Sequence, residues 1–489
     1  MATSFNEARD VIAKLADERS GVFAQDEEII ALEDAVGRTV RTDIHSPLST
    51  PTFDSAAVEG YAVVASQVSS ASPRTPMRLR CMGTIRPGDR PLEIHDTVVS
   101  GYVTCVEIFV GAPFPTAQST KRPYDAIVIR DHATIVEEGG GGRIIQIARP
   151  PLTSWHKRIA GSDFRQNEVI LSRGTSVAPR HIMALASVGI RQISVTRLVR
   201  IGVVSIGSEI ASTVVDQQAL QYRVPDADGP YLAAALREMG EDALYWGVLP
   251  SNGGVLAAFL RDKLQNEQVD IIVTTGGVSR GRESCLIAAL QQLGASTHID
   301  SVAMQPGSSA MLASIPDSAF ESLQRSRNSN IRFQAVDPGG GSFVTPPKTP
   351  GINRKRSPLI FGLPGSPIAS ACCFRFLVTP YIRALVGMYM EQEILARVSL
   401  TPEPTIYQPQ SDGSTREWVV KGSQHYDIFR HAILRSQHDG VSVELARERS
   451  IAKASPFVSS NCWLHVRREH AGVSAGDTGN VYPFCSPKS

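Results

Sequence analysis

Two glycines, Gly276 and Gly277, follow a short apolar stretch in the middle of the chain. That stretch, residues 269–275, has the length and β-branched content of a buried strand, and a polar turn and a helical pattern over residues 283–293 follow it. In an open α/β sheet, ligands bind beyond the carboxyl ends of the strands, where glycine lets the backbone approach an anion. The pattern therefore predicts an anion-binding turn, with a tight strand-to-helix turn that binds nothing as the alternative.

Carboxylates and one thiol offer further chemistry at the predicted turns. Glu59 precedes a strand-like run, Glu209 follows another one directly after Gly207, and Asp226 lies just before a helical pattern. A buried carboxyl group with a raised pKa can act as a general acid, and carboxylates can bind a divalent cation. A solvated turn residue is the alternative for each of them. Cys285 has no histidine close to it in the sequence, so we expect a small core residue rather than a nucleophile.

The composition is that of a soluble globular protein with several domains. Its 489 residues suggest about three domains, and 42% of them are hydrophobic and 20% charged. The net charge of +1 gives no global attraction to nucleic acid or to an anionic membrane, so neither is an expected partner. Seven scattered cysteines without a CxxC pair predict free thiols in a reducing compartment and no zinc site.

No secretory or membrane-spanning segment is predicted. The first 20 residues contain acidic side chains and no apolar core, unlike a signal or transit peptide. The most apolar late stretch, residues 368–390, is interrupted by Arg375, Pro380 and Arg383, which suits a buried helix pair rather than a bilayer span. We therefore expect a cytoplasmic protein.

Strands and helices alternate around the glycine turn. Residues 198–206 predict a strand, and residues 228–239 predict a helix with Asp228 as its N-cap and Pro230 in its first turn. Together with the strand before the two glycines they indicate right-handed βαβ units and a mostly parallel sheet. Another strand, a second Gly/Pro turn over residues 362–367 and a further helix follow.

The remaining segments predict a different architecture. Helical spacing over residues 5–15 and 32–40 predicts two helices at the start of the chain. Short strand-like runs separated by Gly and Pro predict a β-rich unit over residues 77–147, and the last hundred residues predict a small β domain. Residues 317–357 are rich in Ser, Arg, Gly and Pro and predict a flexible surface insertion.

Seven motifs follow one another along the chain: FDSAAVEGYAV, VGAPFP, SIGSEI, DGPYL, TTGGVSRG, the Pro306-Gly307 turn and FGLPGSPIAS. In this order they resemble the molybdopterin molybdenumtransferase family, which includes bacterial MoeA and the gephyrin E domain. The similarity runs from about Phe5 to the C-terminus. Members of that family bind adenylylated molybdopterin, insert molybdate into its dithiolene and release AMP with the assistance of Mg²⁺.

The resemblance implies an α/β and β multidomain fold: an α/β molybdopterin-binding domain like that of MogA, a β-rich insertion domain and a C-terminal β-barrel, in an elongated homodimer. The implied divisions are a helical lead-in (1–45), the β-rich insertion domain (46–165), a helical return segment (166–195), the α/β domain (196–390, including the insertion 317–357) and the barrel (391–489). The implied partners are a small-molecule substrate and a separate protein with the adenylyltransferase domain that we expect this chain to lack.

The resemblance also implies roles for individual residues. Catalytic roles fall on Glu59, Asp163 and Glu209, and Mg²⁺ binding falls on Glu209 and Asp226. The residues implied to bind the pterin substrate are Arg158, Asp226, Gly276, Gly277, Ser279, Arg280, Gly281, Glu283, Pro306, Gly307, Pro364, Gly365 and Ser366.

The chain departs from the family's pattern within these motifs. The family's DNSAMDGY is DSAAVEGY in this chain, and its GDEL is GSEI. Val110 replaces the threonine of the family's TGAP, and Ser284 replaces the last aspartate of its GGVSxGxxD. Gln305 and Ser308 replace the two lysines of its KPGKP, and Ser366 replaces the asparagine of its GLPGNP. Each lost lysine removes a charge-assisted contact of roughly 1.5–3 kcal/mol. Arg280 and Arg282 could replace this charge, or they could be solvated residues at a helix start.

Three functions are compatible with these observations. The first is molybdate insertion with a rearranged anion site, which the full-length resemblance favours. The second is a repurposed small-molecule enzyme of a specialised biosynthetic pathway that uses the same fold without molybdate, which the clustered substitutions favour. The third is a non-catalytic dimeric scaffold or binding protein. The fold alone does not decide among them.

Overall fold

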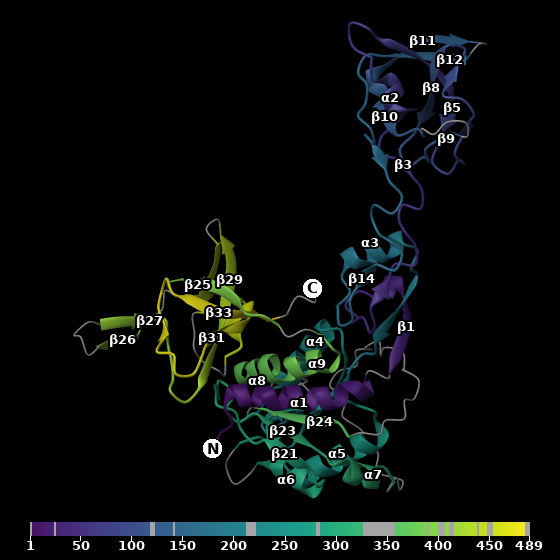
Figure 1. The fold of residues 1–489 in the computed structure, drawn as a ribbon. Helices are drawn as coiled ribbons and strands as arrows, with labels where there is room; N and C mark the ends of the chain where they lie inside the picture. The colour runs from purple at the N-terminus through teal and green to yellow at the C-terminus, as the bar shows by residue number, and fades with distance from the viewer. Residues whose placement is uncertain are drawn as a thin grey trace.

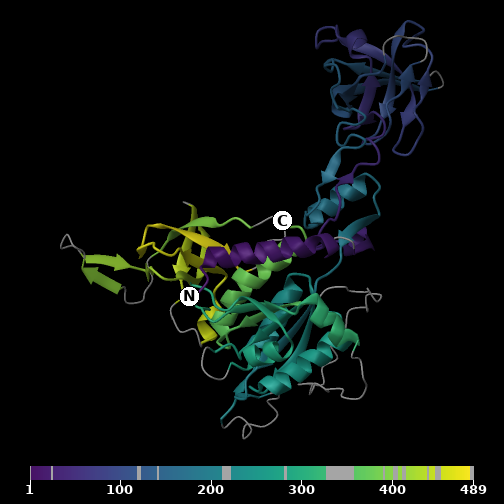
Figure 2. The ribbon, with the colours of Figure 1, turned by 60° about the horizontal axis from the view of Figure 1, so that its bottom comes forward.

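The chain forms four units in an elongated arrangement, seen here in a computed structural model (Figures 1 and 2). A β-rich unit lies at one end, a small connecting unit follows it, and an α/β unit and a small β-barrel lie beside each other at the other end. The structure describes residues 2–23, 26–117, 123–139, 142–211, 222–279, 284–325, 357–388, 391–399, 406–409, 415–437, 440–446 and 453–484.

The N-terminal helix α1 (Phe5–Phe23) is longer than the sequence predicts. Two reciprocal hydrogen bonds begin it: the Ser4 N–H donates to the Glu7 carboxylate (2.9 Å), and the Glu7 N–H donates to Ser4 Oγ (3.2 Å). The second predicted helix is wrong, because only a 3₁₀ turn (Leu32–Asp34) forms there. Gly37 then has a φ of 83°, which ends helical geometry and sends the chain into strand-like bridges.

Helix α1 contacts three units of the protein. Its apolar face packs along helix α9 (Thr379–Leu385) of the α/β unit. At its N-terminal end, the Phe5 ring lies 5.1 Å from the Phe429 ring of the barrel. At its C-terminal end, the Arg197 guanidinium lies 4.1 Å from the centre of the Phe23 ring, at the junction with the connecting unit.

The β-rich unit contains a seven-stranded sheet in the order β10-β4-β8-β5-β12-β11, with β7 beside β8. Its first strand begins at Gly60. Two short strands pair where the chain enters and leaves this unit, β3 (Ser55–Ala56) and β13 (Lys157–Arg158). The strands of the sheet are β4 (Gly60–Val63), β5 (Met77–Ile85), β7 (Val98–Val99), β8 (Tyr102–Ile108), β10 (Ala126–Ile129), β11 (Ala133–Gly139) and β12 (Gly142–Ile147).

The connecting unit is built from two strand pairs and one helix. Strand β1 pairs with β15, and β2 pairs with β14, both antiparallel. The predicted helical return segment is therefore part strand and part helix. The elements are β1 (Glu27–Ala31), β2 (Ile44–His45), β14 (Val169–Leu171), α3 (Pro179–Ser187) and β15 (Gln192–Thr196).

The α/β unit is a six-stranded sheet in the order β19-β16-β20-β24-β23-β21. The first four strands pair in parallel, and β23 pairs antiparallel with both of its neighbours, β24 and β21. This confirms the predicted mostly parallel sheet. Its strands are β16 (Arg200–Ile206), β19 (Asp242–Leu249), β20 (Ile271–Thr275), β21 (Ser296–Ile299), β23 (Met311–Ser314) and β24 (Leu359–Leu363).

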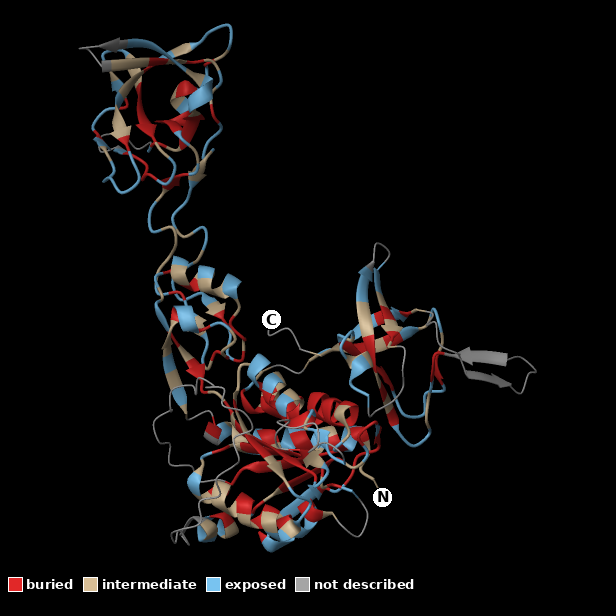
Figure 3. Cartoon of the chain, turned by 180° about the vertical axis from the view of Figure 1, so that it is seen from behind, coloured by how far each residue is buried: buried red, intermediate tan, exposed pale blue. Residues whose placement is uncertain are grey.

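Helices cover both faces of this sheet, and each face has its own apolar core. One core joins the sheet to α1, α4 (Asp228–Glu238), α8 (Pro367–Cys373) and α9. The other joins it to α5 (Gly253–Asn266), α6 (Cys285–Gln292) and α7 (Asp317–Arg325). Buried residues are concentrated here, in the red elements of Figure 3. The sheet is therefore a rigid support for the loops at its edges.

Helices α8 and α9 form one continuous helical run through a π-helical segment (Phe374–Val378). Pro380 cannot donate the usual backbone hydrogen bond, and a π turn just before it accommodates the interruption. Among the described residues, this run (Pro367–Leu385) is the one helix long and apolar enough to cross a bilayer, and 83% of its apolar window is buried inside the protein. We therefore interpret it as a core helix.

The C-terminal unit is a closed barrel of five strands in the order β29-β30-β25-β33-β31, with β31 pairing back to β29. This confirms the predicted barrel. Strand β22 (Met304–Gln305) of the α/β unit pairs parallel with β29 and joins the two units. The barrel strands are β25 (Ile394–Val398), β29 (Asp427–Gln437), β30 (Gly440–Leu445), β31 (Cys462–Val466) and β33 (Thr478–Pro483).

The predicted flexible insertion over residues 317–357 begins too early. Residues Asp317–Arg325 form helix α7, and Phe320 is buried in the core beside α5. An amphipathic pattern inside a Ser- and Arg-rich composition was the missed signal. Residues 326–356 lie outside the described residues.

Candidate functional site

The glycine turn after β20 is held tightly against the neighbouring strand ends. Gly276 and Gly277 have φ values of 83° and 70°, which favour glycine. The Gly276 N–H donates to the Leu363 carbonyl at 2.9 Å. A Cβ atom on Gly276 would lie 2.1 Å from the Ile206 carbonyl oxygen, so the turn leaves no room for a side chain. The two glycines therefore keep the ends of β16, β20 and β24 together.

The second Gly/Pro turn lies directly against the first. A Cβ atom on Gly365 would lie 3.2 Å from the Gly276 Cα atom, and Thr275 Oγ1 lies 3.0 Å from the Pro364 carbonyl oxygen. Helix α8 follows with Pro367 in its first turn, and Ser366 makes no side-chain cap bond there. The structure thus brings together two turns that are about 90 residues apart in the sequence.

Asp228 is a buried carboxyl group beside the two turns. Its Oδ2 atom accepts a 2.7 Å hydrogen bond from Thr275 Oγ1. Burial raises the pKa of Asp228 from 3.8 to about 6, the charge of Asp226 raises it further, and the hydrogen bond from Thr275 lowers it in part. A carboxyl group with this pKa can hold or release a proton near neutral pH. Thr275 was missed in the sequence, although it is the last strand residue before the glycines.

Asp226, and not Asp228, caps the start of helix α4. Asp226 Oδ1 accepts hydrogen bonds from the N–H groups of Asp228 (3.1 Å) and Gly229 (3.2 Å). Its Oδ2 atom accepts from Ser205 Oγ (2.6 Å) and from the Tyr245 hydroxyl. The predicted N-cap is therefore wrong: Ala227 is the N-cap residue and Asp228 the first helical residue, while the side chain of Asp226, one residue before the N-cap, accepts from the first N–H groups and has all of its acceptor sites in use.

Among the described residues, the two carboxylates implied to bind Mg²⁺ are not assembled with further metal ligands. Asp226 has both oxygens engaged, and Glu209 lies on an exposed turn after Gly207. No group of three or more His, Cys, Asp or Glu among the described residues is arranged to hold a metal ion. Mg²⁺ usually requires an octahedral set of oxygen ligands. Magnesium binding by Glu209 and Asp226 stays a prediction, and no step below depends on it.

The hydroxyl group of Tyr245 gives a direct test of the Asp226 cap. Burial raises the pKa of Tyr245, and so does its hydrogen bond to Asp226. We expect Tyr245→Phe to lower the free energy of unfolding by about 1.5 kcal/mol, because a hydrogen bond to a charged acceptor is lost. Urea denaturation at pH 7.5 measures this change. Tyr222→Phe is the control, since Tyr222 is 89% exposed, and equal effects of the two substitutions would contradict the capping role.

The start of helix α6 is capped by Ser284, the residue that replaces the family's aspartate. Its Oγ atom accepts from the Ile287 N–H and donates to the Gly277 carbonyl at 3.0 Å. Cys285 is buried against Gly277, and burial raises the pKa of its thiol, which agrees with a core residue rather than a nucleophile. Ser279 is exposed. Arg280, Gly281, Arg282 and Glu283 lie outside the described residues.

Pro306 and Gly307 are buried beside the far end of helix α8. The Cys373 thiol donates to the Gly307 carbonyl at 3.5 Å, and a Cβ atom on Gly307 would lie 2.3 Å from Cys373 Sγ. Gln305 and Ser308, which stand in place of the family's lysines, are both exposed. The turn thus presents two neutral polar side chains to solvent.

Glu59, Arg158 and Asp163 lie in another part of the molecule. They are exposed and lie near the paired strands β3 and β13, at the foot of the β-rich unit. The ribbon places this region far from β24 in both views (Figures 1 and 2). One chain therefore does not bring these three residues to the glycine turns. The sequence also missed Lys157 here, whose Nζ atom lies 2.7 Å from Asp54 Oδ2.

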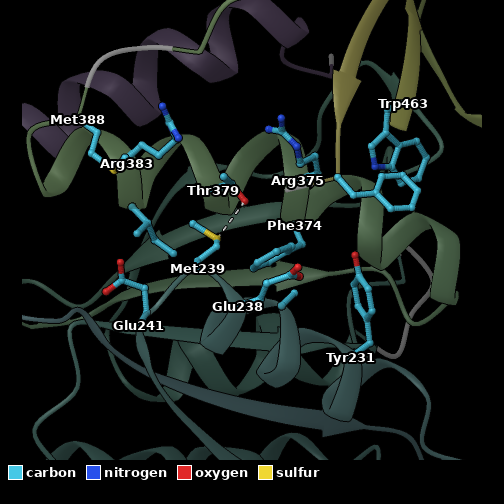
Figure 4. A pocket seen from close by; sticks show the side chains of 13 residues that line it. Tyr231, Glu238, Met239, Glu241, Phe374, Arg375, Thr379, Arg383, Met388 and Trp463 are labelled. Carbon is cyan, nitrogen blue, oxygen red and sulfur yellow. Dashed lines mark hydrogen bonds between the residues drawn. The ribbon is translucent and has the colours of Figure 1, made fainter. Parts of the chain in front are cut away.

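A cavity of about 120 Å³ lies along helix α4, between this helix and the run from α8 to α9 (Figure 4). Figure 4 shows Tyr231 and Met239 of α4 facing Phe374 and Thr379, with a hydrogen bond from Thr379 to the Met239 sulfur. Arg375, on its rim, donates to Glu391 and to the Pro483 carbonyl. This cavity is distinct from the glycine turns, because none of the turn residues lines it.

Two family models match the chain. The model described as MoeA N-terminal region (domain I and II) matches residues 3–189, and the one described as probable molybdopterin binding domain matches residues 202–384. Together they cover the β-rich unit, the connecting unit and most of the α/β unit.

Full-length relatives and structures agree with these matches. The chain is 23% identical to the molybdopterin molybdenumtransferase of Haemophilus influenzae, over 94% of this chain and 95% of that protein, and 27% identical to that of Nostoc sp., over 89% and 87%. A crystal structure titled molybdopterin biosynthesis moeA protein, from Pyrococcus horikoshii OT3, superposes with a TM-score of 0.69 at 17% identity and covers 98% of this chain and 99% of that one. The structural likeness shows the fold of the whole chain.

Proposed function

Because the chain belongs to the MoeA family, we propose that it acts in molybdenum cofactor biosynthesis, inserting molybdate into adenylylated molybdopterin with release of AMP. The similarity to curated molybdenumtransferases over nearly the whole chain supports this proposal. The structural observation that carries it is the contact between the two glycine turns beside Asp228, at the carboxyl ends of β20 and β24.

The two turns supply backbone groups for an anion. Helix α8 begins at Pro367 without a side-chain cap, so the N–H groups of its first turn are oriented toward the end of the sheet. A helix N-terminus favours phosphate and other oxyanions through these N–H groups and the helix dipole. The glycines let such an anion approach the backbone closely. We propose that this turn pair binds the phosphate or molybdate oxyanion.

Asp228 supplies a proton at the same place. An oxide ligand of molybdate that is displaced by a sulfur atom leaves as water and must take up protons. A carboxyl group with a pKa of about 6 is partly protonated near neutral pH and transfers its proton readily. We propose that Asp228 donates this proton, while Thr275 holds its carboxyl group in position.

The described residues of the two turns carry no positively charged side chain, and Arg280 and Arg282 lie outside the described residues. Gln305 and Ser308 are neutral where the family has lysines, and Asp226 and Asp228 add negative charge. The exposed Arg158 pairs with Ser55 of β3, and Figure 1 shows β3 far from β24, so Arg158 cannot contribute in the same chain. We propose that a second copy of the chain in a homodimer brings Arg158, Glu59 and Asp163 to the glycine turns.

The proposed function has a direct test. Calorimetric titration of the purified protein with adenylylated molybdopterin and molybdate, followed by an assay of AMP, should give saturable binding and AMP release that depends on molybdate. Exposed Asp17→Asn should leave both unchanged and serves as the control.

The negative outcomes point to the alternatives. Absence of pterin binding by an intact dimer would mean that the fold has been repurposed, with the neutral Gln305 and Ser308 as the physical reason. Binding without AMP release would favour a non-catalytic binding protein. The proposal also includes a cytoplasmic location and a separate protein that adenylylates the pterin.

A further inference from the structure

Two cysteines face each other in the β-rich unit, away from the proposed site. Cys81 of β5 and Cys105 of β8 are direct partners in the parallel register of these strands. Neighbouring strands lie about 4.8 Å apart, which is within the roughly 4.4–6.8 Å Cα separation that a disulfide spans. The two thiols are also hydrogen-bonded to each other, so their side chains point to the same face of the sheet.

Charged side chains adjoin this pair on the same face. Arg143 of β12 is the register partner of Cys81 on its other side. Glu107, two residues after Cys105, accepts from Arg143 Nη1 at 2.9 Å, from Arg130 Nη2 at 3.2 Å and from Thr84 Oγ1 at 2.8 Å. The charge of Glu107 raises the pKa of Cys81, so the ionised form of this thiol is favoured by its hydrogen bonds to Cys105 and to the backbone and not by a neighbouring guanidinium group.

The two thiols differ in access and in acidity. Cys81 is half-buried, whereas Cys105 is completely buried. The hydrogen bond with Cys105 lowers the pKa of Cys81 to about 6, against the effect of burial. The same hydrogen bond and burial raise the pKa of Cys105 well above its ordinary value. Cys81 is thus arranged to react first and Cys105 second.

We propose that Cys81 and Cys105 are a hydroperoxide-sensitive thiol pair that closes to a disulfide. The Cys81 thiolate attacks one oxygen of the hydroperoxide, the O–O bond breaks, and the departing oxygen leaves with a proton as water or an alcohol. Cys81 is then a sulfenic acid. The Cys105 sulfur attacks the Cys81 sulfur, the S–O bond breaks, and hydroxide takes the Cys105 proton and leaves as water.

The other described cysteines lack this arrangement. Cys372 and Cys373 are completely buried and burial raises the pKa of each thiol. Burial also raises the pKa of Cys285, and it raises that of Cys462 to about 12. Oxidation should therefore select Cys81 among the described thiols.

The pH profile of alkylation tests the ionisation of Cys81. The full-length protein is treated with iodoacetamide between pH 5 and 8.5, and the reaction of each cysteine is followed by peptide mass spectrometry. The rate at Cys81 should level off above about pH 7. In the urea-unfolded protein the same rate should keep rising about tenfold per pH unit to about pH 8, as for an ordinary thiol. A folded profile identical to the unfolded one would overturn the proposal.

Peroxide oxidation tests the pairing. One equivalent of hydrogen peroxide, followed by thiol blocking in denaturant, should give a Cys81–Cys105 disulfide as the main product. Cys105→Ser should stop at a Cys81 sulfenic acid that dimedone traps, and Cys81→Ser should leave Cys105 reduced. Cys462→Ala is the control and should give the same disulfide yield. Two results with the unsubstituted protein would contradict the proposal: a disulfide between other cysteines, or oxidation of another cysteine that is faster than that of Cys81. Neither result depends on a variant.

Discussion

Asparagine in place of Asp228 is expected to make the protein more stable and less active. The folded protein raises the pKa of this carboxyl group from 3.8 to about 6, mainly because the group is buried. A difference of about 2.2 pKa units corresponds to about 3 kcal/mol between the neutral and ionised forms. At pH 7.5 Asp228→Asn removes the buried charge, and we expect the free energy of unfolding to rise by about 2 kcal/mol. This gain is smaller than about 3 kcal/mol because the hydrogen bond from Thr275 is weaker to a neutral amide than to a carboxylate.

The sign of the pH dependence follows from the same shift. A carboxyl group whose folded pKa is raised stabilises the protein fully below pH 3.8, and this stability is lost as the pH rises to about 6. The Asp228→Asn variant and the unsubstituted protein should therefore be equally stable near pH 4 and diverge up to about pH 7. Denaturation at several pH values measures this divergence, and a difference that does not change with pH would contradict the burial of an ionised Asp228.

Activity separates the role of Asp228 in the proposed reaction from its effect on stability. Loss of a positioned proton donor typically lowers kcat by a factor of about 100 or more. Because the variant is expected to be the more stable protein, unfolding cannot account for such a loss. Asp17→Asn, on the exposed side of α1, is the matched control with unchanged stability and AMP release. Full activity of Asp228→Asn would remove Asp228 from the mechanism.

Alanine in place of Gly276 is expected to destabilise the protein by more than 3 kcal/mol. The φ of 83° alone costs a residue with a Cβ atom about 1–2 kcal/mol. The added Cβ would lie 2.1 Å from the Ile206 carbonyl oxygen, which belongs to the central strand β16 and cannot move without separating the strand ends. Chemical denaturation measures the loss, and hydrogen exchange of the β16 and β20 amides should show the opening locally.

Gly189 provides a matched control for this substitution. It has nearly the same φ, 82°, but a Cβ atom there would meet nothing within 4 Å. Gly189→Ala should therefore cost only the conformational penalty, about 1–2 kcal/mol, and leave pterin binding unchanged. If alanine lowers the free energy of unfolding equally at the two positions, the backbone near Ile206 must move to make room for the added Cβ atom. The turn would then be less rigid than described.

Local patterns in the sequence predicted the framework of the site well. The buried strand before Gly276, the parallel βαβ units and the second turn over residues 362–367 are all present, because β-branched runs that end at glycine have few alternative structures. The resemblance added the barrel and the order of the units. The contact between the two turns follows from the parallel sheet, which places the ends of β20 and β24 side by side.

The errors arose where a long-range contact decides the local structure. Asp228 is a good N-cap in sequence, but the hydroxyls of Ser205 and Tyr245 hold the Asp226 carboxylate over the first N–H groups of the helix, and Ala227 becomes the N-cap residue. Residues 32–40 have helical spacing, yet only a 3₁₀ turn forms at residues 32–34, and bridges to residues 176 and 195 hold Thr39 and Val40 extended. The spatial separation of Arg158 from Gly276 cannot be read from motif order, because the β-rich unit extends away from the rest of the chain (Figure 1).

Helix α1 has a consequence for how the chain is made. It is synthesised before the partners that cover it, because its apolar face packs on α9, and Phe5 packs against Phe429 of the barrel. At roughly 5–20 residues per second, ribosomes need about 20–80 s to make the intervening chain. During that interval α9 and the barrel are not yet present, so the part of the apolar face that they will cover is open to chaperones or to other nascent chains. A helix that is made before these partners is thus among the last elements to be fully packed.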